Sequence, residues 1–416
     1  MKLLYSLFIA LLKLGMGVFS VFNEKAKKGV DGRKQSLSTV RQNLKKNDRV
    51  LWMHAASLGE YEQGLPVLER LKKQYPTHKV LVTFFSPSGY DIVAKRKNIA
   101  DAVCYLPFDS KKEIKDFINC FKTDIFITIK YEYWYHLLSE LKKQGTKVYV
   151  VSALFYEKQV FFAPWGAWFT RQLRQNVAWF FHQTEHSKKL AESIGLKNAT
   201  VTGDTRFDRV KQLHERENTV EGIAAFKGDK KLIVFGSSWQ AEEKMLYTLK
   251  DKLPNCRFVV APHDLKRVSS LEETLGDQAI LYSEITLSRL QNAQPRILII
   301  DSIGLLSKIY SYANVAVVGG GFHSAGLHNI LEAATFGVPV IFGNQYKKNP
   351  EADALIAYGG GKSYTNEAEA AAFIIELMND DHQIKNMGNR AGKMVSEQPN
   401  ATELILKKIE QDYKTN

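Results

Sequence analysis

The fold class is decided by one stretch near the N-terminus, Leu51-Trp52-Met53-His54-Ala55-Ala56-Ser57-Leu58-Gly59-Glu60. The apolar run Val50–Met53 predicts a buried strand, and the small residues after it predict a turn into a helix. Ligands of open α/β sheets bind at the carboxyl ends of the strands, which is where Glu60 stands, so this carboxylate suits a general base. Because Ser57-x-x-Glu60 also fits a capping box, the residues alone leave catalysis and helix capping evenly balanced.

Pro66 bears on the choice between catalysis and helix capping for Glu60. Proline is tolerated in the first turn of a helix but not deep inside it. We therefore expect the regular helix to begin near Gly64-Leu65-Pro66, which would leave Glu60 on the loop before the helix.

A second passage from strand to helix lies late in the chain. Ala316–Val318 predicts a buried strand, and it opens into a loop with four glycines, Gly319-Gly320-Gly321-Phe322-His323-Ser324-Ala325-Gly326-Leu327-His328. A helix is predicted from Asn329, a good N-cap, to Phe336, where Gly337 and Pro339 stop it. Such a loop lets the backbone approach a ligand, and a helix N-terminus attracts an anion. The pattern is neither the dinucleotide fingerprint nor a P-loop. Glu332 either caps the helix or accepts hydrogen bonds from ribose hydroxyls.

Apolar runs alternate with helical patterns from about residue 48 onward, which predicts an α/β fold with two doubly wound, Rossmann-like domains facing a cleft. The predicted strands are Val50–Met53, Val80–Phe84, Ala102–Tyr105, Ile125–Ile129, Val148–Val151, Trp179–His182, Leu232–Phe235, Arg257–Ala261, Ile297–Ile300, Val315–Val318 and Val338–Phe342. The predicted segments are an N-terminal anchor with a basic region (1–30), a first domain (48–213), a charged link (214–231), a second domain (232–400) and a C-terminal helix (401–416).

Length and cysteine usage agree with this division. A chain of 416 residues exceeds one usual core. Its three cysteines are widely spaced and form no disulfide framework, which is typical of a reducing compartment. No histidine pair has zincin spacing, so no metal site is predicted.

The net charge of +13 is concentrated at the N-terminus, where the first 50 residues carry 11 Lys and Arg against 3 Asp and Glu. A basic segment suits nucleic acid, anionic lipid or solubility. Its neighbour, Leu3–Phe22, is apolar with Lys13 as the only charge, which favours a membrane anchor on the cytoplasmic side and argues against nucleic acid.

The anchor has two predicted forms. Spanning the bilayer would cost roughly 2.5–3.5 kcal/mol for Lys13 near the middle. A narrow polar stripe on one helix face (Lys2, Ser6, Lys13, Ser20, Glu24) favours an in-plane or shallowly inserted helix, with spanning as the alternative. A cleaved signal peptide is disfavoured, because Lys13 interrupts the apolar core and no convincing cleavage site follows.

Together these segments resemble the lipid A Kdo transferases, bacterial glycosyltransferases that move 3-deoxy-D-manno-octulosonic acid (Kdo) from CMP-Kdo to a lipid A precursor. The resemblance covers nearly the whole chain, and the order and spacing of its segments make it specific. The matching segments are His54–Glu60, Thr83–Tyr90, Leu106–Asp109, Glu132–Trp134, Ser152–Phe155, Gly203–Asp208, Gly236–Ser238 and His328–Ala333.

The resemblance implies the GT-B architecture and roles for three charged residues. Glu60 matches the general base, which takes the proton of the acceptor hydroxyl as the hydroxyl attacks the anomeric carbon. Attack opposite the leaving group would invert that carbon. Glu132 matches a transition-state carboxylate, but Lys130-Tyr131 replace a neighbouring carboxylate, so an ion-pair role stays open. Arg206 stands where members usually carry Lys and would stabilise the leaving CMP, unless it is a surface arginine.

The second half would bind CMP-Kdo, without metal or other cofactor. The substrate-binding residues so implied are Ser237, Ser238, Pro262, His263, Ile303, Gly304, Leu305, Asn329, Ile330, Leu331 and Glu332. The two serines would bind phosphate or the Kdo carboxylate, although a loop serine is more often only a cap or turn residue. The family's Pro-Arg-His appears here without its arginine, and Lys266 or Arg267 is the candidate replacement.

The leading hypothesis is an inverting Kdo transferase at the cytoplasmic face of a Gram-negative inner membrane. Its partners would be CMP-Kdo, a lipid A precursor of the lipid IVA type, and anionic lipids. One alternative is another GT-B transferase or epimerase using a UDP-sugar, because fold alone does not decide function. A second alternative, a membrane-tethered protein that binds nucleic acid, would leave Glu60 without a role. The aromatic run Phe161–Phe169 suits a core or, as a minority alternative, the acyl-chain face of an acceptor site.

Overall fold

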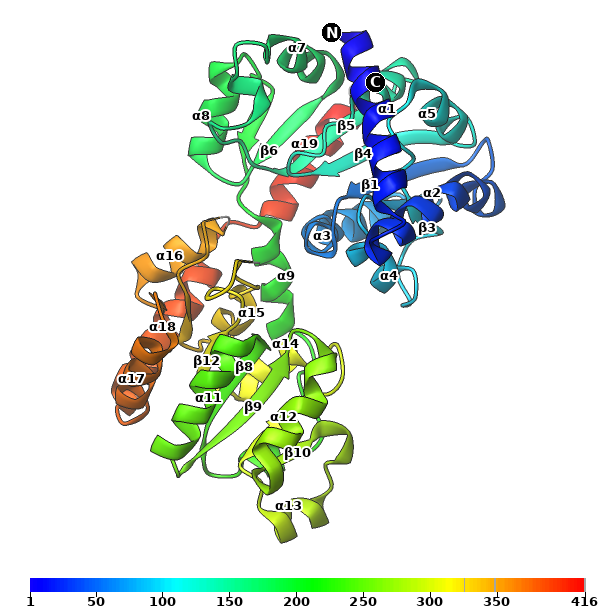
Figure 1. Ribbon diagram of the computed structural model, residues 1–416. Helices are drawn as coiled ribbons and strands as arrows, with labels where there is room; N and C mark the ends of the chain where they lie inside the picture. The colour runs from blue at the N-terminus through cyan, green and yellow to red at the C-terminus, as the bar shows by residue number, and fades with distance from the viewer. Residues whose placement is uncertain (325, 348, 415–416) are drawn as a thin grey trace. The chain divides into compact units, whose positions relative to one another are not determined.

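The computed structural model describes residues 1–324, 326–347 and 349–414, which form two compact units (Figure 1). The first unit holds Met1–Arg209 together with the chain from Pro399 onward, and the second holds Val210–Gln398. The boundary falls inside a helix, α9 (Thr205–His214), and the predicted link 214–231 contains a further short helix, α10 (Ile223–Lys227). Each unit contains a seven-stranded sheet with parallel neighbours, so the predicted α/β class with two doubly wound sheets is confirmed.

The sheet of the first unit has the order β3-β2-β1-β4-β5-β6-β7. Its strands are β1 (Arg49–Ala55), β2 (Lys79–Phe84), β3 (Ala102–Tyr105), β4 (Lys122–Ile129), β5 (Lys147–Ala153), β6 (Trp179–His182) and β7 (Ala199–Val201). Apart from Arg49, every residue of β1 is buried, because helices cover both faces of a parallel sheet. Val50 and Trp52 pack into the core on one face, and Leu51 and Met53 into the core on the other.

The helices of this unit cover both faces of the sheet (Figure 1). They are α1 (Lys2–Phe19), α2 (Glu24–Asn43), α3 (Leu58–Gln74), α4 (Pro87–Val93), α5 (Lys111–Ile118), α6 (Tyr135–Lys143), η1 (Val160–Phe162), α7 (Ala167–Asn176), α8 (Glu185–Ser193) and α19 (Ala401–Lys414). The predicted C-terminal helix is thus present, and it buries Ile405 and Ile409 in the core that α3 also enters.

The predicted start of α3 is wrong. The helix begins at Leu58, Glu60 lies in its first turn, and Pro66 lies well inside it. Ser57 is the N-cap, and its hydroxyl accepts from the Glu60 N–H at 3.5 Å. Proline removes one backbone hydrogen bond, but Leu65 and Val67 beside it are buried, and that burial holds the helix together.

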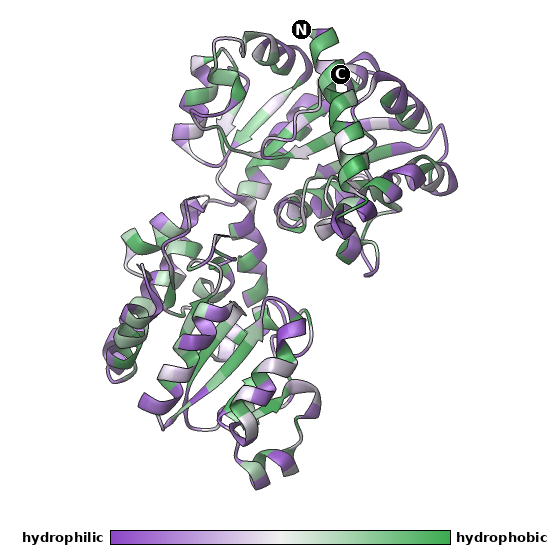
Figure 2. Cartoon of the chain, in the orientation of Figure 1, coloured by the Kyte–Doolittle hydropathy of each residue, from purple (hydrophilic) through white to green (hydrophobic). Residues whose placement is uncertain are grey.

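Helix α1 is largely apolar (Figure 2), and among the described helices it is the one long and apolar enough to cross a membrane. Only 11% of it is buried, which excludes an ordinary core helix. Two residues of the predicted polar stripe, Ser6 and Lys13, contact the rest of the first unit, whereas Ser20 and Glu24 lie beyond the end of α1. Ser6 Oγ lies 3.0 Å from His136 Nε2, and Lys13 pairs with Glu113 at 2.5 Å. The outward face carries exposed Leu4, Leu7, Leu11 and Leu14.

A buried carboxylate fastens α1 in place. Asp109 accepts from the Tyr5 hydroxyl at 2.6 Å and from the backbone N–H groups of His136 and Leu137 at 2.8 Å. These two N–H groups belong to the first turn of α6, which has no other carboxylate at that end. Asp109 therefore caps α6 and binds α1 at the same time.

The sheet of the second unit has the order β10-β11-β9-β8-β12-β13-β14. Its strands are β8 (Lys231–Ser238), β9 (Cys256–Pro262), β10 (Ala279–Leu281), β11 (Ile297–Ile299), β12 (Val315–Val318), β13 (Val340–Gly343) and β14 (Gly361–Tyr364). Its remaining helices are α11 (Gln240–Lys252), η2 (Leu265–Arg267), α12 (Val268–Leu275), η3 (Gly276–Gln278), η4 (Tyr282–Glu284), α13 (Leu287–Ala293), α14 (Leu306–Ile309), η5 (Tyr310–Tyr312), α15 (Leu331–Ala334), α16 (Pro350–Tyr358), α17 (Glu367–Met378) and α18 (Asp381–Ser396).

Helix α15 is shorter than the predicted Asn329–Phe336. It covers only Leu331–Ala334, because the next backbone bonds run from Phe336 N–H to the Ala333 oxygen and from Gly337 N–H to the Ala334 oxygen. Such three-residue steps tighten a helix end into a turn. Asn329 is not the N-cap that was predicted, although its side chain still accepts from the Leu331 N–H at 3.1 Å.

Candidate functional site

Glu60 is held at the carboxyl end of β1 by the start of α3. Its Oε2 accepts from the backbone N–H of Ala56 at 2.5 Å, and only 7% of the residue is exposed. The carboxylate therefore does serve the helix start. Since one oxygen makes this bond, the capping role does not exclude a chemical one.

The surroundings of Glu60 favour its protonated form. Burial, followed by the negative charge of Glu132, raises the pKa of Glu60 to about 7, against the Ala56 N–H and the charge of Lys130, which lower it. A raised carboxyl pKa beside a second carboxylate is typical of acid–base sites. The structure thus brings two of the three predicted catalytic residues into one electrostatic neighbourhood.

Glu132 lies in the turn that follows β4. Its Oε2 accepts from Trp134 Nε1 at 3.1 Å, and its backbone oxygen accepts from the Thr128 hydroxyl at 3.0 Å. His54 Nε2 is 3.7 Å from the same Oε2. The side chain nearest to the Glu132 carboxylate among the salt-bridge candidates is therefore a buried histidine rather than Lys or Arg.

His54 was not among the predicted site residues, although it opens the matching segment. It is fully buried in β1, and its Nδ1 lies 3.0 Å from Thr83 Oγ1 and 3.1 Å from the Thr83 oxygen on β2. These contacts aim Nε2 at Glu132. The sequence alone does not show that His54 pairs with Thr83 on the neighbouring strand.

Lys130 has a left-handed backbone with φ of 59° at the carboxyl end of β4. Such a conformation is costly for a residue with a side chain and concentrates at functional sites. Lys130 occupies part of the stretch where the sequence departs from the family pattern, and its charge counteracts the effect of Glu132 on the Glu60 pKa.

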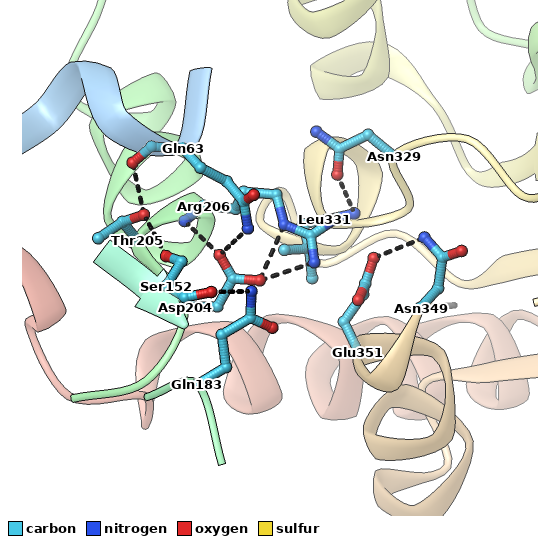
Figure 3. A network of polar contacts seen from close by, with 10 residues as sticks. All are labelled: Gln63, Ser152, Gln183, Asp204, Thr205, Arg206, Asn329, Leu331, Asn349 and Glu351. Carbon is cyan, nitrogen blue, oxygen red and sulfur yellow. Dashed lines mark hydrogen bonds and ion pairs between the residues drawn. The ribbon is translucent and has the colours of Figure 1, made fainter. Parts of the chain in front are cut away.

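Arg206 is anchored by a buried carboxylate (Figure 3). Its Nε and one terminal nitrogen donate to Asp204 Oδ2 at 2.9 and 2.6 Å, and its backbone N–H donates to Asp204 Oδ1 at 2.9 Å. Gln63, on the α3 turn after Glu60, donates to the same Oδ1 at 2.9 Å. The guanidinium is therefore a fixed charge tied to the helix that carries Glu60, not a freely moving surface arginine.

Asp204 stays ionised in this setting. Burial alone would raise its pKa, but the charge and hydrogen bonds of Arg206 and the Gln63 amide outweigh burial, so the pKa of Asp204 is lowered. Around it, Thr205 Oγ1 donates to the Gln63 backbone oxygen at 2.5 Å and lies 3.0 Å from Ser152 Oγ (Figure 3). Ser152 has φ of 53°, a second strained residue at the strand ends of this sheet.

In the second unit, Ser237 and Ser238 end β8. Ser237 has φ of 51°, and the Ser238 hydroxyl is buried with no hydrogen-bond partner among the described residues. A Cβ on Gly319 would lie 2.0 Å from the Ser237 oxygen. The close approach of β8 and the glycine-rich loop is thus possible only because residue 319 is glycine.

Trp239 sits in a stack of rings that sequence analysis missed. Its ring lies 4.7 Å from that of His263 and 4.5 Å from that of His323, and its Nε1 donates to His328 Nε2 at 3.2 Å. Burial, helped by the neighbouring His263, lowers the pKa of His328 to about 4, so His328 is neutral at pH 7. The His263 N–H also donates to the Ser238 oxygen at 3.0 Å, next to Pro262 at the end of β9.

Glu242 joins the two loops of this site. One oxygen accepts from the Trp239 N–H at 2.9 Å and the other from the Gly320 N–H at 3.1 Å. Burial raises the pKa of Glu242 even though these two bonds oppose the shift. Glu242 was not predicted, because its partner Gly320 is distant in sequence.

The other predicted donor-site residues are placed as follows. Asn329 Nδ2 donates to Glu332 Oε1 at 3.1 Å, while Ile330 and Leu331 are buried. In the turn before α14, Ile303 is 79% exposed, Gly304 has φ of 99°, and Leu305 is the N-cap. Lys266 and Arg267 are the two candidates for the arginine that is missing from the Pro-Arg-His pattern. The Arg267 guanidinium is paired with Glu243, whereas the backbone N–H of Lys266 donates to the Asp264 side chain. Within 1–324, 326–347 and 349–414, no cluster of three or more His, Cys, Asp or Glu suits a metal ion.

Comparison with solved structures supports the architecture. UDP-GlcNAc 2-epimerase from Neisseria meningitidis, bound to UDP-GlcNAc, is 19% identical, with a TM-score of 0.60 over 87% of this chain and 100% of that chain. The wall teichoic acid polymerase TagF is 14% identical, with a TM-score of 0.51 over 97% of this chain and 98% of that chain. At such identities the likeness concerns the fold alone.

Comparison with related sequences narrows the class of protein that this chain resembles. Residues 31–209 match the sequence model described as 3-deoxy-D-manno-octulosonic-acid transferase (kdotransferase). The 3-deoxy-D-manno-octulosonic acid transferase of Aquifex aeolicus is 26% identical over 83% of this chain and 90% of its own length, and that of Haemophilus influenzae is 23% identical over 86% and 85%. A bifunctional glycosyltransferase/methyltransferase of Fusobacterium nucleatum is 26% identical over 73% of this chain, which matches about half (48%) of that relative.

Two Rossmann-like units and these relatives define a glycosyltransferase with the GT-B fold. Residues 31–209 match the model of the 3-deoxy-D-manno-octulosonic acid (Kdo) transferases, and transferases of that name from several bacteria are similar to most of the chain.

Proposed function

We propose that this protein transfers Kdo from CMP-Kdo to a lipid A precursor of the lipid IVA type, with inversion at the anomeric carbon. The observation that carries the proposal is Glu60, a buried carboxylate at the carboxyl end of β1 whose pKa is raised to about 7. A general base is most effective when its pKa lies near the working pH.

In the proposed step, Glu60 takes the proton of the acceptor hydroxyl while that oxygen bonds to the anomeric carbon of Kdo. The bond from this carbon to the phosphate oxygen breaks, and CMP leaves with the electron pair. Because attack and departure occur on opposite faces, the configuration inverts. Glu132 stabilises the positive charge that develops on the sugar, and His54 and Trp134 hold its carboxylate in position.

Negative charge on the departing CMP requires a fixed positive partner. We assign this role to Arg206, which Asp204 and Gln63 orient. The proposal assigns no step to a metal ion. The donor is held by the second unit, where the strained Ser237, the buried Ser238 hydroxyl and the glycine-rich loop supply polar groups that suit a phosphate or carboxylate.

The acceptor is proposed to reach the first unit from the cytoplasmic face of the inner membrane. Helix α1 supports this location, since its Ser6 and Lys13 contact the unit and its outward face is apolar. A helix bonded to its own domain along one side suits an in-plane anchor better than a spanning one. The basic residues that follow α1 suit anionic lipid headgroups.

The test is mass spectrometry of a tetraacylated lipid A precursor incubated with purified protein and freshly made CMP-Kdo. A mass gain of one or more Kdo units establishes donor, acceptor and reaction, and counts the additions. No gain with folded protein and intact CMP-Kdo, but gain of a sugar from a UDP-linked donor, would overturn the proposal. Configuration at the new linkage, read by NMR, separates inversion from retention.

A further inference from the structure

A small aromatic pocket lies in the first unit beside the turn that carries Glu132. Its volume is about 120 Å³, and its walls come from that turn, α6, η1 and α7. Eight of its ten lining residues are apolar or aromatic, among them Tyr131, Tyr133, Val160, Phe161 and Leu173. An apolar cavity of this size is comparable to one that accepts a benzene ring, so it suits a short run of methylene groups.

The mouth of this pocket is an exposed apolar surface. The lining residues Tyr131 and Val160 are 40 and 39% exposed, and the ring of Tyr156, which is 44% exposed, lies 6.4 Å from that of Tyr131; Trp165, five residues after Val160 in the chain, is 65% exposed. In the part of the first unit that the structure describes, the other exposed large apolar side chains lie in residues 1–22, except Leu404. Clustered exposure of this kind marks an interaction site rather than chance.

One end of the pocket adjoins the proposed reaction centre. Tyr131 and Tyr133 flank Glu132 in sequence and both line the pocket. Tyr131 is close enough to Glu60 and Glu132 that their charges, after the effect of burial, help to raise its pKa. A ligand that occupies the pocket would therefore lie next to the base.

The other end adjoins α1. Tyr135 and Phe169 form pocket walls, and on their other side they contact Tyr5 of α1 at ring distances of 5.5 and 6.4 Å. The same helix carries the outward apolar face. The walls of the pocket thus include residues beside the group that would activate a hydroxyl and residues that contact the element that would contact lipid.

We propose that this pocket binds part of a fatty-acyl chain of the acceptor, and so positions the sugar hydroxyl at Glu60. The inference rests on the proposed function. Eight of the ten lining residues offer apolar or aromatic surface, and each methylene that moves out of water onto such a surface favours binding. The volume admits a segment of one chain, so the remaining acyl chains stay in the bilayer.

The test compares two acceptors, the tetraacylated precursor and the same phosphorylated disaccharide with all acyl chains removed, in one detergent. Val160→Trp narrows the mouth at a part-exposed position where the fold tolerates a larger side chain. The expected result is a KM for the acylated acceptor roughly tenfold higher, with kcat and the KM for the deacylated acceptor unchanged. Leu404→Trp, an equivalent exposed change on α19, serves as the matched control and leaves both values unchanged.

Two outcomes overturn the inference while transfer itself stands. Either wild-type protein uses the two acceptors with equal KM, or Val160→Trp raises both KM values alike, which indicates a structural effect. A third outcome would also contradict the acyl subsite: Val160→Trp binds phosphatidylglycerol vesicles less well than wild type, but the ratio of its KM values for the two acceptors is unchanged. The mouth would then contact the bilayer rather than an acyl chain of the acceptor. Failure of wild-type protein to use either acceptor would instead contradict the proposed function.

Discussion

The two candidate half-sites are built by opposite means. In the first unit, the carboxyl ends of the strands present charged side chains, namely Glu60, Glu132 and Arg206. Burial and the charge of Glu132 raise the pKa of Glu60, and Arg206 is paired with Asp204. In the second unit, the strand ends present backbone, brought close by Gly319 and fastened by Glu242 and the Trp239 stack. Proton transfer requires a tuned side chain, whereas holding an anion requires accessible N–H groups. Substitutions should therefore act through chemistry in the first unit and through space in the second.

The largest expected effect tests the chemical side of this contrast. Glu60→Gln keeps the size and the hydrogen bond from the Ala56 N–H but cannot take a proton. We expect transfer to fall by about 10² to 10⁴ while CMP-Kdo binding by calorimetry persists. Glu69→Gln, further along α3, is the control. Near-normal turnover of Glu60→Gln would remove Glu60 from the mechanism.

The spatial side is tested by Gly319→Ala. The new Cβ meets the Ser237 oxygen at 2.0 Å, so the two loops must separate. We expect the free energy of unfolding to fall by about 1–3 kcal/mol and CMP-Kdo binding to weaken at least tenfold. Gly392→Ala is the matched change in the same unit, since its Cβ meets nothing nearer than 3.5 Å. Denaturant unfolding measures the stability, and calorimetry measures CMP-Kdo binding. If Gly319→Ala and Gly392→Ala had the same stability and affinity, close packing at Gly319 would not be what the second unit depends on.

An intermediate effect is expected from Asp204→Asn. The change leaves the Arg206 guanidinium without its buried carboxylate but keeps an acceptor for Gln63. We expect kcat to fall roughly tenfold and stability to fall by about 2 kcal/mol, less than for a fully buried pair because Arg206 is partly exposed. Asp116→Asn on α5 is the surface control. An unchanged kcat in a less stable protein would mean that Asp204 acts on the fold alone.

A smaller effect is expected in the pH dependence. The pKa of Glu60 is raised to about 7, so the base is protonated and inactive below that pH, and kcat/KM should rise as pH increases through about 7. Glu132→Gln removes the like charge and should move this midpoint to lower pH. The measurement is kcat/KM as a function of pH for wild type and Glu132→Gln at constant ionic strength. An identical midpoint in the two proteins would show that the charge of Glu132 does not affect the pKa of Glu60.

No effect is expected from chelation. Dialysis against EDTA should leave the transfer rate unchanged, because the proposal supplies positive charge through Arg206 and backbone N–H groups. A loss of rate that added Mg²⁺ or Zn²⁺ restores would show that the leaving group depends on a metal.

Sequence patterns anticipated most of the fold for a physical reason. Parallel strands buried on both faces must be apolar throughout, so β1 and β8 were visible as runs. The strands absent from the predicted list, β7, β10 and β14, lie at the edges of their sheets and are short and partly exposed. The start of α3 was misplaced because the rule for Pro66 counts one hydrogen bond and ignores the burial beside it.

The candidate site was anticipated unevenly. Glu60 and Arg206 could be placed because each follows a strand directly. His54 and Trp239 could not be assigned contacts, because their partners arrive through strand order: β2 brings Thr83 to His54, and β9 and β12 bring His263 and His328 to Trp239. Sequence marks residues at strand ends, but which ends are neighbours is a property of the sheet.

The last helix has a consequence for synthesis of the chain. Helix α19 completes the first unit, burying Ile405 and Ile409, and its Thr402 donates to Asp208 at 2.7 Å through both its N–H and its hydroxyl. The second unit has all its strands and helices before α19 is made. On the ribosome, the second unit can therefore mature first, while the unit that carries Glu60 waits until α19 has been made. A nonsense mutation just before the codons of α19 would therefore disable the first unit, although almost all of that unit is encoded far upstream.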